Sequence, residues 1–261
     1  MGMRQILLEI AYQGTGYSGW ARQQNVPTIQ GTLEDALEKV VRQRLEVFGS
    51  SRTDAGVHAL GQLAVFMTES RIPADKFVRA INYYLPDDIR ILRAEEYPLD
   101  FLPLKHVWRK KYLYLIDDAS IPSPFLKNRV WLTGTGTLDT EKMHLAAQHL
   151  AGTHDFAGFQ SQGSPRLSTV RTVFHISVRR LAKDGEKGDG LSDRPLILFE
   201  VEGDGFLYNM VRIIVGTLVE TGWGKRSPDG IRDVLLAKKR SHAGLTAPPE
   251  GLYLKKIDFR P

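Results

Sequence analysis

A short polar loop carries the residues best suited to acid–base or nucleophilic chemistry. Residues 50–59 read Ser-Ser-Arg-Thr-Asp-Ala-Gly-Val-His-Ala and lie between two apolar segments. Arg52 and Asp54 place opposite charges two residues apart, and loops on a rigid sheet commonly hold catalytic side chains. The alternative is a structural turn in which the Asp54 carboxylate accepts hydrogen bonds from main-chain N–H groups. The residues alone leave both interpretations open.

A second segment, residues 108–114, mixes cations with aromatic side chains (Trp-Arg-Lys-Lys-Tyr-Leu-Tyr). Such a mixture suits a nucleic acid, because rings stack on bases while ammonium and guanidinium groups hold phosphates. However, Tyr112 and Tyr114 are two residues apart, so they also fit one face of a half-buried strand. The pattern indicates an RNA contact or a strand face.

The third candidate is Arg212, which lies within the mostly apolar stretch 205–216. A buried guanidinium requires a partner, so Arg212 either extends to water or pairs with a carboxylate in a cleft. We expect Asp54 to be that partner, because a nearby cation favours the charged form of a carboxylate in a dry site.

Residues 14–19 match G-x-G-x-x-G and follow an expected strand, which would suit a nucleotide-dependent oxidoreductase. The next segment, residues 20–27, is polar and ends in proline, so it does not open the helix that would meet a pyrophosphate. We therefore interpret residues 14–19 as a substrate or turn loop.

The sequence has no phosphate-loop, G-x-S-x-G or H-E-x-x-H motif, no cysteine and only scattered histidines. We expect neither a metal nor a cofactor.

Apolar spacing predicts the elements that position these residues. The first half reads strand, helix, strand, strand, helix, strand over residues 5–12, 28–41, 45–48, 62–67, 73–85 and 89–96. Thr28 is the expected N-cap of the first helix. The second half predicts strands over 112–116, 173–178, 196–202 and 252–259 and helices over 140–150 and 208–221. Residues 183–194, rich in glycine and charge, are expected to form a mobile loop.

This pattern predicts two α+β domains of the split β-α-β, ferredoxin-like type, with antiparallel-rich mixed sheets and a catalytic cleft between them. We place the boundary near Leu104, so that residues 1–104 form the first domain and 105–261 the second.

Composition supports a globular, cytoplasmic protein. The 261 residues are 42% hydrophobic and 25% charged, which is typical of folded domains. No apolar run is long enough to span a membrane, and zero cysteines suit a reducing compartment.

The net charge of +5 divides unevenly, with −2 in residues 1–104 and +7 in the rest. Basic runs at 105–111 and 238–240 predict a phosphate-rich partner or, alternatively, a solvated surface.

The run over residues 51–59 resembles the catalytic signature of the tRNA pseudouridine synthase A family. Further segments follow in that family's order, over residues 14–20, 110–114, 159–161, 206–216 and 247–254, so the resemblance covers essentially the whole chain. Two positions depart from the family pattern. Ser51 stands where glycine usually precedes the arginine, and Ala21 stands where glutamine is common.

The resemblance implies a cofactor-free isomerase that converts uridine to pseudouridine at positions 38, 39 and 40 in the tRNA anticodon stem-loop, acting as a homodimer. It implies that Asp54 is the essential carboxylate, either as a nucleophile at the ribose or as a base that starts a glycal route. It implies supporting roles for four residues: Tyr112 stacks on the uracil, Arg212 pairs with Asp54, Leu252 lines the pocket and Arg52 assists base extrusion. The rival interpretation is an RNA-binding protein that kept the fold and lost catalysis.

Overall fold

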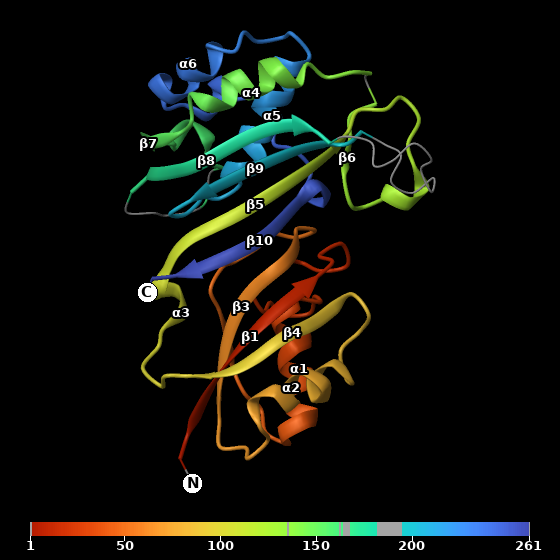
Figure 1. Ribbon diagram of the computed structural model, residues 1–261, viewed down its shortest axis with the longest axis vertical. Coiled ribbons are helices and arrows are strands. Elements are labelled where there is room, and N and C mark those ends of the chain that lie inside the picture. The colour runs from red at the N-terminus through yellow and green to blue at the C-terminus, as the bar shows by residue number, and fades with distance from the viewer. Residues whose placement is uncertain (1, 135, 162, 164–167, 182–194, 261) are drawn as a thin grey trace. The chain divides into compact units, whose positions relative to one another are not determined.

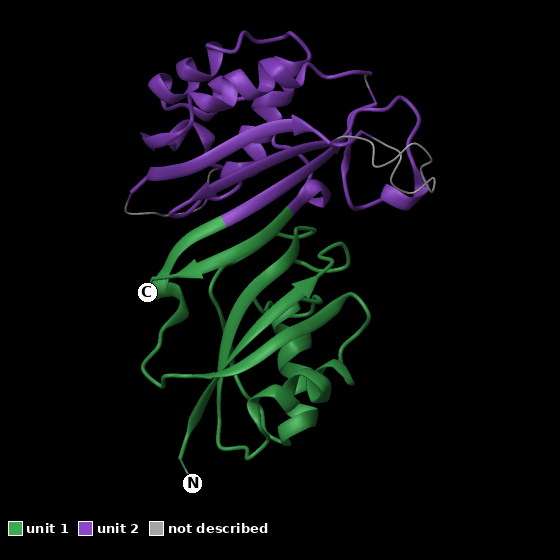
Figure 2. Ribbon diagram, viewed as in Figure 1, with its two compact units in different colours: residues 1–110, 253–261 green, residues 111–252 purple. Residues whose placement is uncertain are grey.

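The computed structural model describes residues 2–134, 136–161, 163, 168–181 and 195–260. The chain forms two compact units (Figure 2). Unit 1 comprises residues 1–110 and 253–261, and unit 2 comprises residues 111–252. The chain leaves unit 1 within strand β5 (Val107–Asp117) and returns at the start of strand β10 (Leu252–Phe259). The division of the chain into domains at Leu104 stays a prediction.

Unit 1 has the predicted order of strand, helix, strand, strand, helix, strand. Its elements are β1 (Arg4–Tyr12), α1 (Ile29–Val41), β2 (Val47–Gly49), β3 (His58–Thr68), α2 (Ala74–Asn82), β4 (Ile89–Tyr97) and the short α3 (Pro103–His106). Strand β1 pairs antiparallel with both β3 and β4, β2 pairs antiparallel with β3, and β10 pairs parallel with β3. The last strand of the chain therefore completes the first unit.

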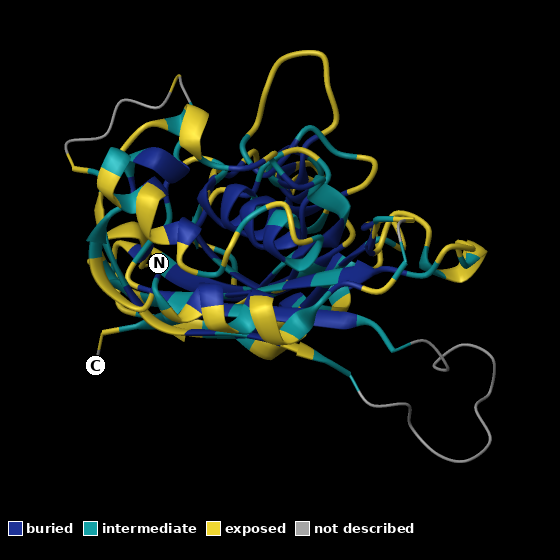
Figure 3. Ribbon diagram, turned by 90° about the horizontal axis from the view of Figure 1, so that it is seen from above, coloured by how far each residue is buried: buried dark blue, intermediate teal, exposed yellow. Residues whose placement is uncertain are grey.

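The core of unit 1 lies between this sheet and helices α1 and α2, which pack together on one face (Figure 1). The hydroxyl of Thr28 accepts a hydrogen bond from Gly31 N, which confirms the predicted N-cap. Helix α1 buries Ile29, Leu33 and Leu37 at helical spacing. In Figure 3, buried residues concentrate in strands and helices, and many exposed residues lie in the loops.

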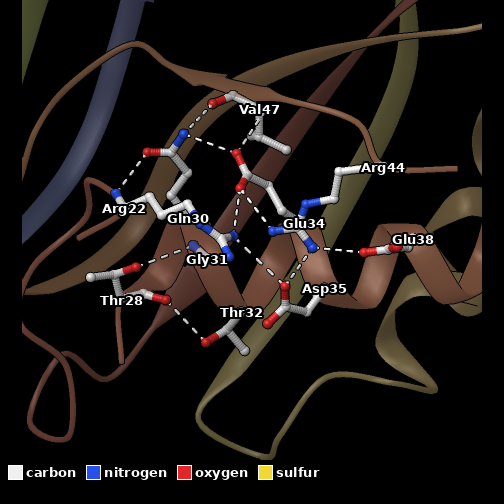
Figure 4. A network of polar contacts seen from close by, with 10 residues as sticks. All are labelled: Arg22, Thr28, Gln30, Gly31, Thr32, Glu34, Asp35, Glu38, Arg44 and Val47. Carbon is white, nitrogen blue, oxygen red and sulfur yellow. Dashed lines mark hydrogen bonds and ion pairs between the residues drawn. The ribbon is translucent and has the colours of Figure 1, made fainter. Parts of the chain in front are cut away.

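A network of charged side chains holds helix α1 to its neighbours (Figure 4). Its centre is Glu34, whose side chain is only 5% exposed. One carboxylate oxygen lies 2.8 Å from Arg22 Nη1 and 3.6 Å from Arg44 Nη2. The other oxygen accepts hydrogen bonds from Gln30 Nε2 and Val47 N. The network thus connects α1 to the segment before it and to strand β2.

Unit 2 contains a largely antiparallel sheet backed by helices. After β5 come η1 (Pro124–Leu126), β6 (Trp131–Leu132), α4 (Thr140–Gln148), β7 (Gly152–Asp155), η2 (Ala157–Phe159), β8 (Val170–Arg180), β9 (Ile197–Gly203), α5 (Met210–Gly222), α6 (Gly230–Ala237), η3 (Arg240–His242) and η4 (Pro249–Gly251). Strand β8 pairs antiparallel with β7 and β9. Helices α4, α5 and α6 lie together on one side of β8 and β9 (Figure 1).

The predicted helices and strands of unit 2 are confirmed as elements, with boundaries shifted by a few residues. Sequence analysis missed β6, β7 and α6. The two strands have two and four residues, too few for a period-2 pattern to emerge, and the eight-residue α6 carries a glycine at its first position. The loop predicted over residues 183–194 lies outside the described residues.

Candidate functional site

The loop that contains Asp54 connects strand β2 to strand β3. A hydrogen bond of 3.1 Å from Val57 N to the carbonyl of Asp54 closes a tight turn, and Gly56 adopts a φ of +79° within it. Arg52 is exposed, Thr53 is buried and Asp54 is half-buried. This turn is closed by main-chain groups, and the alternative in which the Asp54 carboxylate itself accepts hydrogen bonds from main-chain N–H groups stays a prediction. The turn fixes where the loop runs, which a catalytic carboxylate also requires.

Side chains and main-chain groups from three other segments hold this loop. The hydroxyls of Tyr12 and Thr53 lie 2.8 Å apart, and both residues are buried. Trp20 N donates to the Thr53 carbonyl at 3.0 Å. The side chain of Gln62 is fully buried, and its Nε2 donates a hydrogen bond of 2.8 Å to the Ser51 carbonyl. Strands β1 and β3 and the segment after β1 thereby restrict the backbone on the N-terminal side of Asp54.

Ser51, one of the two departures from the family pattern, has a specific contact. Its hydroxyl accepts a hydrogen bond of 2.9 Å from Lys110 Nζ. Ser51 is only 3% exposed, so the ammonium group of Lys110 is drawn to the base of the loop. A glycine at position 51 would offer no side-chain acceptor for this lysine. The other departure, Ala21, is half-buried between Trp20 and Arg22.

Two tyrosines of β5 share one buried face in unit 2. Tyr112 is 7% exposed and Tyr114 is 0% exposed. The ring of Tyr112 stands edge-on to Phe206, with ring centroids 5.2 Å apart and planes at 88°. This burial fits the strand-face interpretation of the pair, and the stacking role of Tyr112 stays a prediction.

The guanidinium of Arg212 is held within unit 2 by two acceptors. Nε donates to the carbonyl of Ala247 at 2.7 Å, and Nη1 donates to Asn209 Oδ1 at 2.9 Å. Asn209 Nδ2 in turn donates to Ser161 Oγ at 3.0 Å. Asn209 precedes α5 with a φ of 59°, in the left-handed region. The pair between Arg212 and Asp54 joins residues of different units and stays a prediction.

Tyr114 anchors the segment that leads to Leu252. Its hydroxyl donates to the carbonyl of Pro248 at 2.7 Å, and its ring leaves no room for a side chain at Gly251. Burial raises the pKa of Tyr114 strongly, and Glu250 adds to this rise while Arg212 opposes it. The tyrosine is therefore a neutral donor at physiological pH. Leu252 itself is 6% exposed.

Sequence reasoning missed Tyr12, Gln62, Tyr114 and Asn209 as positioning groups. Tyr12 and Tyr114 read as strand-face aromatics, and Gln62 as a strand terminus. The partners of Tyr12 and Tyr114 are more than 30 residues away, that of Gln62 is 11 residues away, and Asn209 has one partner 48 residues away besides nearby Arg212. One usable signal was Asn209, because asparagine before an apolar helix is a common cap and tolerates positive φ.

Several basic residues singled out from the sequence have partners inside the protein. Lys111 Nζ lies 3.0 Å from Glu200 Oε1, and Lys238 Nζ lies 2.9 Å from Asp155 Oδ2. The described residues include no group of three or more His, Asp or Glu side chains arranged to hold a metal ion. Within the same residues, no helix is long and apolar enough to cross a membrane.

Comparisons with known proteins agree on one family. The family model described as tRNA pseudouridine synthase matches residues 10–103 and 146–260. A protein of Acetivibrio thermocellus named "tRNA pseudouridine synthase A" is 45% identical over 98% of this chain and 100% of its own length. Proteins with the same name from Geotalea uraniireducens and a Thermoanaerobacter species are 44% and 42% identical, again over 98% of this chain and 100% of their own lengths.

Proposed function

We propose a specific site and mechanism for this chain, which belongs to the tRNA pseudouridine synthase family and is an isomerase acting on uridine in tRNA. We propose that it modifies positions 38, 39 and 40 in the anticodon stem-loop and that Asp54 is the essential carboxylate. The observation that carries the role of Asp54 is the loop of residues 51–57, whose backbone is fixed by buried groups on the N-terminal side of Asp54. The three positions in tRNA follow from the family resemblance.

The reaction needs a carboxylate at one fixed position. The bond between N1 of uracil and C1′ of ribose breaks, the base turns, and C5 bonds to C1′ while its proton is lost and N1 gains one. Asp54 would act either by attacking C1′ or by removing a ribose proton to give a glycal. Neither route changes the oxidation state of the whole nucleotide. Both routes depend on orientation, and a correctly held group removes much of the entropic part of a barrier.

Four further residues complete the proposal. A paired uridine must leave the helix stack before a carboxylate can reach its sugar, and exposed Arg52 would assist this step from the Asp54 loop. Tyr112 would stack on the uracil, and Leu252 would form an apolar wall of the pocket. Arg212 would pair with Asp54, because the two acceptors that fix its guanidinium are neutral.

The remaining parts of the proposal have separate grounds. The element pattern supports two ferredoxin-like domains with the catalytic cleft between them, composition supports a cytoplasmic location, and the family resemblance implies a homodimer. The rival is a tRNA-binding protein without catalysis. It would bind the same RNA and leave every uridine unchanged.

A tritium-release assay separates these functions. A tRNA transcript labelled with [5-³H]uridine loses tritium when C5 bonds to the ribose. We expect release from a transcript with uridine at positions 38, 39 and 40, and loss of that release when all three are replaced by cytidine. Release that survives the triple replacement would contradict the proposed positions. Tight binding with no release from any transcript would support the rival.

A further inference from the structure

The glycine loop, residues 14–20, contributes only the main-chain N–H of Trp20 to the proposed function. It lies between strand β1 and helix α1, and Gly14 and Gly19 are buried within it. A Cβ at Gly14 would overlap the carbonyl group of Val57, and one at Gly19 would lie 2.8 Å from the Thr53 carbonyl oxygen. Gly19 also has a φ of +95°, which side chains disfavour. Only glycine permits this approach of two main chains.

Hydrogen bonds join the same two loops on both sides of Asp54. Before it, the Thr53 carbonyl accepts from Trp20 N at 3.0 Å. After it, Gly56 N donates to the Tyr17 carbonyl at 3.3 Å. Gly14 N donates to Nδ1 of His58, a side chain that is 1% exposed. The glycine loop therefore contacts the turn at its entry and at its exit.

The glycine loop is itself attached to helix α1 and the segment before it. Ser18 N donates to the Pro27 carbonyl at 2.8 Å, and Ile29 N donates to the Gly19 carbonyl at 3.2 Å. The hydroxyl of Tyr17 donates to Asp88 at 2.7 Å, next to β4. Burial raises the pKa of Tyr17, and the hydrogen bond to Asp88 raises it further, so the hydroxyl stays protonated. A loop held in this way can transmit rigidity to what it touches.

We propose that Gly14 and Gly19 are positioning residues, which fix the main chain of residues 53–57 so that the Asp54 carboxylate occupies one place. This inference rests on the proposed catalytic role of Asp54. A displacement of about 1 Å in a reacting group costs on the order of 100-fold in rate. A methyl group at Gly19 must push the Thr53 carbonyl away by several tenths of an ångström, which is a sizeable part of that distance, and the φ of +95° adds backbone strain.

The test compares Gly19→Ala with Gly16→Ala. Gly16 lies in the same loop, but nothing approaches within 4 Å of the place its Cβ would occupy, and its φ is ordinary. Tritium release from [5-³H]uridine tRNA gives kcat and KM, filter binding gives Kd, and circular dichroism shows the folded fraction at the assay temperature. We expect Gly19→Ala to lose about 100-fold in kcat with its Kd for tRNA within about twofold of wild type. Gly16→Ala should keep the wild-type kcat.

Two outcomes would overturn the inference while the wild type is active. One is a folded Gly19→Ala protein with wild-type kcat, and the other is an equal loss of kcat in Gly16→Ala. If Gly19→Ala does not fold, Tyr12→Phe removes only the hydroxyl bonded to Thr53. That variant should lose about fivefold in kcat at unchanged Kd, and an unchanged kcat would also overturn the inference. An inactive wild type would reject the proposed function, and the inference with it.

Discussion

Two carboxylates of unit 1, those of Glu34 and Asp54, differ in what the hydrogen bonds around them fix. Glu34 is fixed through its own side chain, because both oxygens accept hydrogen bonds or ion pairs from Arg22, Arg44, Gln30 and Val47 N (Figure 4). Around Asp54, hydrogen bonds with Tyr12, Trp20 and Gln62 fix the main chain of the residues that precede it. A carboxylate with every lone pair engaged stabilises a fold. A carboxylate on a loop fixed by its backbone can be positioned for a substrate.

The largest predicted effect separates these two carboxylates by activity. Asp54→Asn should lower kcat by at least about 1,000-fold, because the amide neither attacks C1′ nor accepts a ribose proton. The free energy of unfolding should change by less than about 0.5 kcal/mol, as for most substitutions outside the core. Tritium release and urea denaturation measure the two quantities. Activity within tenfold of wild type, at unchanged tRNA affinity, would reject Asp54 as the essential group.

Glu34→Ala should give the converse result. The buried N–H of Val47 and the amide of Gln30 lose their acceptor, which costs about 2 kcal/mol in the free energy of unfolding. Arg22 and Arg44 are 48% and 43% exposed, so water replaces much of the lost ion pairing. The kcat of the folded protein should stay within about twofold.

Glu38→Ala is the matched control for the Glu34 prediction. Glu38 pairs with the same Arg44 at 2.7 Å but is 49% exposed. Its removal should change the free energy of unfolding by less than about 0.5 kcal/mol. Equal losses of stability in the two variants would show that burial of Glu34 is not the source of its contribution.

The same comparison extends to unit 2 through Arg212. Asn209→Gly removes the acceptor of Arg212 Nη1 but suits the φ of 59° at this position. A hydrogen bond to a charged group contributes about 1.5 kcal/mol or more, so kcat/KM should fall about tenfold. Ser161→Ala leaves that acceptor in place and should retain kcat/KM within about twofold. Equal activity of Asn209→Gly and wild type would show that Arg212 needs no such support.

Most of the fold followed from local patterns, whereas the supports of the site did not. The spacing of Ile29, Leu33 and Leu37 predicted α1, and Thr28 predicted its start. Both patterns involve residues at most four positions apart in the sequence, so they can be recognised without the structure. The bond between Tyr12 and Thr53 joins positions 41 residues apart. No periodicity encodes such a partner. The role of Asp54 is itself a prediction from a motif, since the spacing of residue types in that loop is local information.

Ser51→Gly tests a departure from the family pattern. It removes the acceptor of Lys110 Nζ, and the resulting freedom of the lysine should lower kcat/KM about fivefold. Lys110→Met supplies the control in a double-mutant cycle. If the hydroxyl acts through the lysine, Ser51→Gly should cause no further loss in the Lys110→Met background. Additive losses would mean that Ser51 acts on the loop backbone independently of Lys110.

The smallest predicted effect concerns which cations contact the phosphates of tRNA. As with the carboxylates, a cation that is paired inside the protein is expected to differ from one that can bind a substrate. Lys111 already has Glu200 as a partner, whereas Lys239 is exposed and makes no ion pair with the described residues. Each cation that contacts a phosphate adds about one unit to the slope of log binding constant against log salt. Lys239→Ala should therefore reduce that slope by about one, and Lys111→Ala by clearly less. The reverse order would show that the Glu200 pair opens to bind RNA, and that an internal partner does not mark a charge as structural.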